Sequence, residues 1–121
     1  MLTPVATTDV CAASFPYIDR TECERQLAYA VAVNWQCKPG FRAELLELAT
    51  EFAPLARLEE GCLFYQIHTD PNDPELIFIY ELYTNEDAFK EHIGTPYFER
   101  LVRQGMLPLL ESRSTHFYIT T

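Results

Sequence analysis

One glutamate and one histidine stand out as side chains that could move a proton. Glu81 interrupts Leu76–Tyr83, a run that is otherwise almost wholly apolar, and a buried carboxylate needs a partner. His92 lies beside Phe89 and Ile93 in the next segment. Imidazole titrates near neutral pH, which suits proton transfer, and a carboxylate can orient it. We predict that Glu81 and His92 form a catalytic pair; alternatively, they tie a helix to the sheet or bridge two subunits.

A second set of side chains is suited to holding a substrate. Tyrosine offers an aromatic wall and a hydroxyl that can hold a substrate oxygen. Ordinary packing in a core or an interface is the competing interpretation for each tyrosine, and a histidine near a turn is more often solvated. The predicted substrate-binding residues are Asn34, Tyr65, His68, Tyr80 and Tyr83.

Composition limits the classes of protein to which the chain can belong. The 121 residues and 14.0 kDa predict one domain. The net charge of −9 and the pI of about 4.6 argue against nucleic acid and anionic membranes as partners. No apolar run reaches the length of a membrane span, and the N-terminus does not resemble a signal peptide. We therefore expect a cytoplasmic protein with no membrane partner.

The sequence predicts neither a metal site nor a nucleotide cofactor. The histidines at 68, 92 and 116 are scattered, and there is no glycine-rich phosphate motif. The cysteines lack metal-site spacing, so we expect them to be reduced thiols. They are Cys11, Cys23, Cys37 and Cys62.

The first half of the domain reads as a strand, a helix and a hairpin. Arg25–Cys37 alternates, with bulky residues on one face and alanines, ending in Asn34 and Gln36, on the other. The alanine row predicts either a close helix or a cavity beside it. Phe41–Glu59 has helical periodicity, and Pro54 predicts a kink or a second short helix. Gly61 then reads as a left-handed cap.

The hairpin and the second half complete a β-α-β-β-α-α-β order. Cys62–Thr69 and Leu76–Tyr83 read as strands around a polar turn. Thr84–Asp87 opens a helix with Thr84 or Asn85 as its cap, and Thr95-Pro96 starts another with Thr95 as its cap. Ser112–Thr120 alternates as a last strand. This order predicts an α+β, ferredoxin-like sandwich with an antiparallel sheet over residues 25–121, preceded by an N-terminal extension, residues 1–24.

The strands carry apolar residues on both faces, although helices can cover only one face of such a sheet. The other face should then meet a second sheet, most simply that of another copy of the chain. We therefore predict a homodimer.

Several short motifs, in order, resemble the antibiotic biosynthesis monooxygenase (ABM) domain of the dimeric α+β barrel superfamily. The resemblance covers about Leu27–Thr121 and implies a barrel formed across a dimer, with a pocket between sheet and helices in each subunit. In that pattern a glutamate and a histidine recur at Glu81 and His92. The motifs are K-P-G (Lys38–Gly40), E-x-G-C (Glu59–Cys62), D-P-x-D-P (Asp70–Pro74), Y-E-x-Y (Tyr80–Tyr83), A-F-x-x-H (Ala88–His92) and T-P-Y-F (Thr95–Phe98).

The resemblance implies a cofactor-independent monooxygenase that oxidises a small quinol, anthrone or related aromatic with O2. The alternatives are a non-redox isomerase or lyase that uses the His/Glu pair, and a non-catalytic ligand-binding dimer, because one fold serves many activities. Haem degradation is disfavoured, since His92 stands where that branch has a tryptophan and Phe98–Gln104 contains no histidine.

Overall fold

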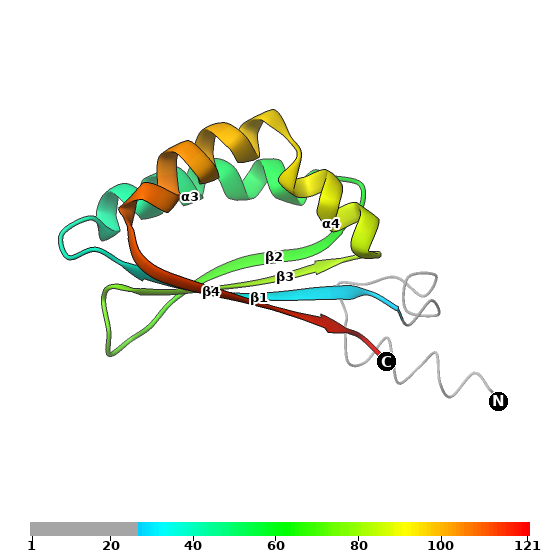
Figure 1. Ribbon diagram of the computed structural model, residues 1–121, viewed down its shortest axis with the longest axis horizontal. Coiled ribbons are helices and arrows are strands. Elements are labelled where there is room, and N and C mark those ends of the chain that lie inside the picture. The colour runs from blue at the N-terminus through cyan, green and yellow to red at the C-terminus, as the bar shows by residue number, and fades with distance from the viewer. Residues whose placement is uncertain (1–26) are drawn as a thin grey trace.

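A computed structural model describes residues 27–121. The predicted N-terminal extension, residues 1–24, lies outside the described residues. The described chain is an antiparallel sheet with its helices gathered on one face (Figure 1). The predicted α+β, ferredoxin-like order is confirmed. The elements are β1 (Tyr29–Cys37), α3 (Arg42–Arg57), β2 (Cys62–Thr69), β3 (Leu76–Tyr83), α4 (Glu86–Ile93), η1 (Phe98–Met106), η2 (Leu107–Leu109) and β4 (Leu110–Ile119).

The four strands lie in the order β2-β3-β1-β4. The hairpin between β2 and β3 was predicted with its observed bounds. Its turn is held by Asp70, whose Oδ1 accepts hydrogen bonds from the backbone N–H groups of Asn72 at 2.7 Å and Asp73 at 2.9 Å. An aspartate that bonds its own following backbone stabilises a turn, as the local sequence indicated.

The helix α3 buries one stripe against the sheet and continues through Pro54 to Arg57. The predicted kink or second helix at Pro54 is therefore wrong. Pro54 is exposed near the end of the helix, so it removes only one backbone hydrogen bond late in the element. The burial of Phe52 and Ala56 on either side holds the last turn against the sheet.

The second helical segment contains a feature that the sequence did not predict. Asn85 caps α4 by accepting a 2.9 Å hydrogen bond from the Ala88 N–H, and Gly94 ends the helix. Thr95 Oγ1 caps the next segment through the Phe98 N–H, as predicted. That segment, η1, is a π-helix rather than an α-helix. Its i→i+5 hydrogen bonds widen each turn, and such segments are frequent at functional sites.

The two faces of the sheet differ in what they contact. Register places Tyr29, Val31, Val33 and Trp35 of β1 on the side of Glu81, toward the helices. The alanine row of β1 lies on the opposite face. The cavity described below is therefore beside the bulky residues and not beside the alanines, because the helices contact the larger, more apolar side.

Gly61 is needed for close packing and not for a left-handed backbone. Among the described glycines only Gly40 has a positive φ, +87°, so the predicted cap at Gly61 is wrong. Instead, a Cβ at Gly61 would lie 2.4 Å from the Cβ of Ala88 in α4. The absence of a side chain there lets α4 approach the start of β2.

We expect Gly61→Ala to lower the free energy of unfolding by about 1–3 kcal/mol, because two methyl groups cannot share that space. Urea denaturation measures the change. The double variant Gly61→Ala/Ala88→Gly removes the clash, so its destabilisation should be smaller than the sum of the two single variants. A strictly additive result would refute the packing explanation.

Candidate functional site

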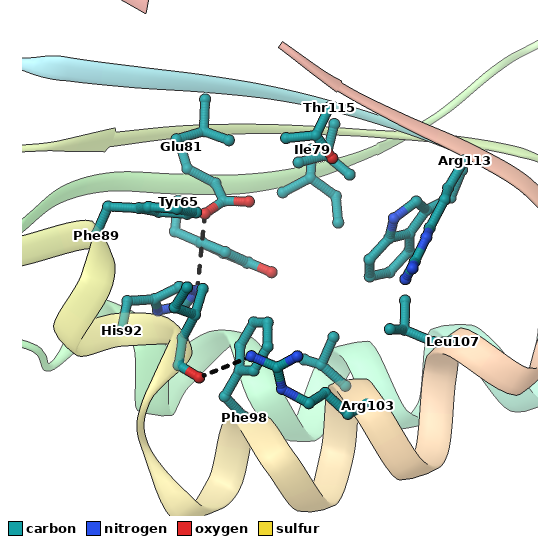
Figure 2. Close-up of a pocket in the computed structure, with 15 residues that line it drawn as sticks. Tyr65, Ile79, Glu81, Phe89, His92, Phe98, Arg103, Leu107, Arg113 and Thr115 are labelled. Carbon is teal, nitrogen blue, oxygen red and sulfur yellow. Dashed lines mark hydrogen bonds and ion pairs between the residues drawn. The ribbon is translucent and has the colours of Figure 1, made fainter. Parts of the chain in front are cut away.

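A cavity of about 240 Å³ opens between the sheet and the helices α4 and η1 (Figure 2). Most of its lining is aliphatic or aromatic, which excludes water from polar groups inside it. Strands β1, β2, β3 and β4 form one wall, and α4, η1 and η2 form the other. Its apolar lining includes Val31, Val33, Trp35, Ile79, Phe89 and Phe98.

His92 lies at one end of this cavity, between two carboxylates. It projects from α4, and only 2% of its surface is exposed. Its Nδ1 atom is 2.9 Å from Oε1 of Glu59 and 3.1 Å from Oε2 of the same residue. Its Nε2 atom is 3.7 Å from Oε1 of Glu81 (Figure 2). The imidazole is therefore bound firmly on one side and faces a looser carboxylate partner on the other.

Glu59 sets the tautomer of His92. The Glu59 carboxylate accepts a hydrogen bond from the hydroxyl of Tyr97 as well as contacting Nδ1. Burial, followed by the hydrogen bond to Glu59, raises the pKa of Tyr97 to about 12, so this hydroxyl remains a donor. A carboxylate that accepts from a ring N–H holds the proton on that nitrogen. Nδ1 thus carries the N–H, and Nε2 is the atom free to exchange a proton.

Glu81 projects from β3 toward the helices and is 5% exposed. The hydroxyl of Tyr83, on the same face of the strand, donates a 2.6 Å hydrogen bond to its Oε1. Burial raises the pKa of Glu81, while the neighbouring His92 and the Tyr83 hydroxyl act in the opposite direction. A carboxyl with a raised pKa is a better base than an exposed one. The pair Glu81–His92 can accordingly accept a proton and pass it along.

Glu81 and His92 lie close together, as predicted. Of the five predicted substrate-binding residues, only Tyr65 lines the cavity. Tyr65 lines the cavity, and its side chain points inward beside Glu81 (Figure 2). Tyr83 supports Glu81 from behind. Asn34, His68 and Tyr80 lie on the opposite face of the sheet.

The placement of those three follows from strand register. Asn34 is opposite Phe78, and His68 is opposite the same residue on the other side of β3. The Nδ1 atom of His68 lies 3.2 Å from the Phe78 carbonyl oxygen. Tyr80 contacts the ring of Phe64. The cavity receives none of them, so any role in substrate binding would need a ligand on the other face of the sheet.

Sequence reasoning missed part of the site. Glu59 belongs to the E-x-G-C motif, but nothing in the local sequence links it to His92 in helix α4. Trp35, one of the bulky residues of β1, also lines the cavity. The cavity contains two cations that were not predicted, Arg103 and Arg113. Alternation along β4 could have indicated Arg113, because it shares a face with Thr115.

Other features of the described chain bear on the remaining sequence expectations. Within residues 27–121, no cluster of three or more His, Cys, Asp and Glu side chains is arranged to bind a metal. The same part of the chain contains no helix long and apolar enough to span a membrane. Cys37 and Cys62 are free thiols, as predicted; the other two cysteines lie outside the described residues. Burial, reinforced by the nearby carboxylates Glu59 and Glu81, raises the pKa of Cys62 to about 12, which makes it a poor nucleophile.

Solved structures share this fold. A conserved protein from Methanosarcina mazei superposes with a TM-score of 0.75 at 22% identity, covering 81% of this chain and 97% of that protein. A candidate antibiotic biosynthesis monooxygenase from Caulobacter crescentus gives a TM-score of 0.74 at 26% identity, covering 79% and 92%.

Sequence comparison leads to a family. An uncharacterised protein of Synechocystis is 31% identical over 75 residues, which are 62% of this chain. The match spans about half, 51%, of that relative's length. The family model described as antibiotic biosynthesis monooxygenase matches residues 28–104, which include β1, both carboxylates, His92 and most of η1. The chain therefore belongs to the antibiotic biosynthesis monooxygenase family.

Proposed function

We propose that the protein is a cofactor-independent monooxygenase that oxidises a small quinol, anthrone or related aromatic with O2. The observation that supports this proposal most directly is the buried Glu81–His92 pair at the end of an apolar, aromatic cavity. Such oxygenation needs a base that makes the substrate electron-rich and a dry site that holds the resulting anion. Family membership supports the same reaction class.

The reaction begins with proton transfer from the substrate hydroxyl to Glu81, which shares the proton with Nε2 of His92. The resulting phenolate gives one electron to O2, and the two radicals combine to form a C–O bond at an unsubstituted ring carbon. The pair then returns a proton to the distal peroxide oxygen. Loss of the C–H proton and cleavage of the O–O bond release water and leave a carbonyl. The substrate loses two hydrogens and gains one oxygen atom.

The tyrosines have supporting roles in this proposal. Tyr65 points into the cavity near Glu81, where its hydroxyl can donate a hydrogen bond to the substrate oxygen (Figure 2). Burial, with the nearby carboxylate of Glu81, raises the pKa of Tyr65 well above its ordinary value, so this hydroxyl is a donor throughout the physiological range. Tyr83 orients Glu81.

A second candidate function is a non-redox isomerase or lyase. The observation that favours it is the second carboxylate: Glu59 holds Nδ1 of His92 at 2.9 Å and gives the imidazole one defined acid–base nitrogen. This arrangement can move a proton between two carbons of a ketone without O2. A ligand-binding dimer that uses the same cavity without turnover is the third candidate.

We also propose that the protein is a homodimer. The described helices all lie on one face of the sheet (Figure 1), and the other face carries Phe78, Tyr80 and Tyr118, of which Tyr118 is 58% exposed. Pairing these faces would bury the aromatic residues. The free thiols suit a reducing compartment, so we expect the dimer to act in the cytoplasm.

Oxygen uptake by the metal-stripped protein tests the proposed function. We expect consumption above autoxidation with some members of a panel of hydroquinones and anthrones, with one labelled oxygen atom from isotopic O2 entering each product molecule. Uptake that never exceeds autoxidation would reject the oxygenase. Enzyme-dependent exchange of a carbon-bound proton in D2O, measured by NMR without O2, would then favour the isomerase.

A further inference from the structure

The charges that line the cavity are unlike those of the whole chain. The chain carries 9 Lys and Arg residues against 18 Asp and Glu residues. Among the residues that line the cavity, the charged ones are Glu81, Arg103 and Arg113. The two arginines outnumber the one carboxylate, so this lining carries a net positive charge. A positive cavity in an acidic protein focuses its field on anions that enter it.

Arg103 reaches the cavity because η1 is a π-helix. In an α-helix a residue five positions on from Phe98 would point about 140° away from it. In η1 the guanidinium of Arg103 lies over the Phe98 ring, 5.1 Å from its centroid. One of its nitrogens lies 3.5 Å from the backbone carbonyl oxygen of Ile93 (Figure 2). The ring and the carbonyl hold the guanidinium at the cavity wall.

Arg103 is not committed to a strong ion pair. Its partner Glu99 is 3.3 Å away on the same helix, but both side chains are about half exposed, and pairs of this kind contribute little. The half-exposed side chain of Arg103 can therefore still meet a ligand. A planar guanidinium can bind a carboxylate or a phosphate through two parallel hydrogen bonds.

Arg113 enters from the opposite wall. It lies on β4 opposite Trp35, and register places it on the helix-facing side with Thr115. The side chain of Arg113 is exposed and makes no hydrogen bond or ion pair with another side chain of residues 27–121. Figure 2 shows Arg113 descending from β4 at the end of the cavity away from His92. Arg103 comes from η1, and its guanidinium points toward the Ile93 carbonyl, between Arg113 and His92. The cavity thus has the acid–base pair at one end, Arg113 at the other, and Arg103 on the helical wall between them.

We infer that the substrate carries an anionic oxo-group, a carboxylate or a phosphate, which Arg113 and Arg103 bind from opposite walls of the cavity while Glu81 and His92 receive the ionisable hydroxyl. This inference rests on the proposed function for the role of the hydroxyl. Contacts at both the arginines and the Glu81–His92 pair would fix the direction in which the aromatic ring of the substrate enters the cavity. They would also favour such a substrate over neutral quinols, because an uncharged ligand forms no ion pair with either arginine.

Calorimetric titration without O2 tests the inference, with gentisate, methyl gentisate and hydroquinone monophosphate as probes. Trp35 is the chain's single tryptophan and lines the cavity, so quenching of its fluorescence reports binding there. We expect gentisate, hydroquinone monophosphate or both to bind at least about tenfold more tightly than the neutral ester, since a hydrogen bond to a charged group contributes about 1.5–3 kcal/mol. Which of the two binds more tightly identifies the anion.

The variants Arg103→Gln and Arg113→Gln should each reduce this preference, and the double variant should abolish it. Arg100→Gln is the matched control, because Arg100 lies on the same helix and pairs with Glu51 outside the cavity. Equal binding of anion and ester by the wild type, a preference that survives in the double variant, or no binding of any probe would overturn the inference.

These results separate the anion site from the oxygenase. An arginine-dependent preference for anions without oxygen uptake would keep the site and reject the oxygenase. Oxygen uptake with neutral quinols at a rate that neither arginine substitution changes would keep the oxygenase and reject the anion site.

Discussion

Replacing His92 with glutamine is expected to lower kcat by about 10²- to 10⁴-fold, the usual contribution of a positioned acid–base group. The amide retains a donor for Glu59, which contacts Nδ1 at 2.9 Å in the native protein, but it cannot exchange a proton with Glu81. KM should change much less than kcat, because His92 handles the proton and contributes little apolar binding surface. Initial rates of oxygen uptake with the best substrate of the panel measure both constants.

A folded variant is essential to this experiment, since His92 contacts the rings of Phe52, Tyr83 and Phe98. Near-ultraviolet circular dichroism and sedimentation should match the wild type. Glu91→Gln provides the control, because Glu91 is an exposed neighbour on α4. Full turnover in a correctly folded His92→Gln protein would remove His92 from the catalytic mechanism and leave it a structural link between α4 and the sheet.

Replacing Glu81 with glutamine is expected to stop turnover and, at neutral pH, to stabilise the protein. Burial raises the pKa of Glu81, so the folded state disfavours the ionised carboxylate more than the unfolded state does. Glutamine has nearly the same shape and can still accept the hydrogen bond from Tyr83, but it has no charge to desolvate. A residue kept at a cost in stability is typical of a functional site.

The pH dependence of this effect has a definite sign. Because the folded-state pKa is raised, the contribution of Glu81 to stability is fully present below its unfolded pKa and is lost as pH rises through the folded pKa. The wild type should therefore lose stability relative to Glu81→Gln over that interval, with a slope of at most about 1.4 kcal/mol per pH unit. Urea denaturation of both proteins from acid to neutral pH measures the difference.

Two outcomes would contradict the account of Glu81. A difference in stability that stays constant with pH would mean that the Glu81 carboxyl titrates alike in both states. A Glu81→Gln protein with wild-type oxygen uptake would show that another group accepts the substrate proton. Glu91→Gln again serves as control and should leave turnover unchanged.

Local sequence patterns determined the framework of the protein. Alternation and turn residues placed the β2–β3 hairpin with its observed bounds, because strand period and turn chemistry depend only on near neighbours. Caps at Asn85 and Thr95 were visible for the same reason. The pairing of Glu81 with His92 was also predictable, since an isolated carboxylate in an apolar strand must meet a polar group on the element that covers it. Composition and periodicity together determined the α+β class.

Only the tertiary structure decided which other residues complete the site. Glu59 reaches His92 across 33 positions of sequence, and no local pattern encodes a contact of that kind. Asn34 and Tyr80 lie on the other face of the sheet because strand register, set by the packing of whole elements, decides which alternate side chains face the helices. The π-helix that brings Arg103 over Phe98 depends on how η1 packs against α3, since its amino acids would also form an α-helix. Side chains that are able to transfer a proton are thus evident from the sequence, whereas their orientation and the charges that line the cavity arise from packing.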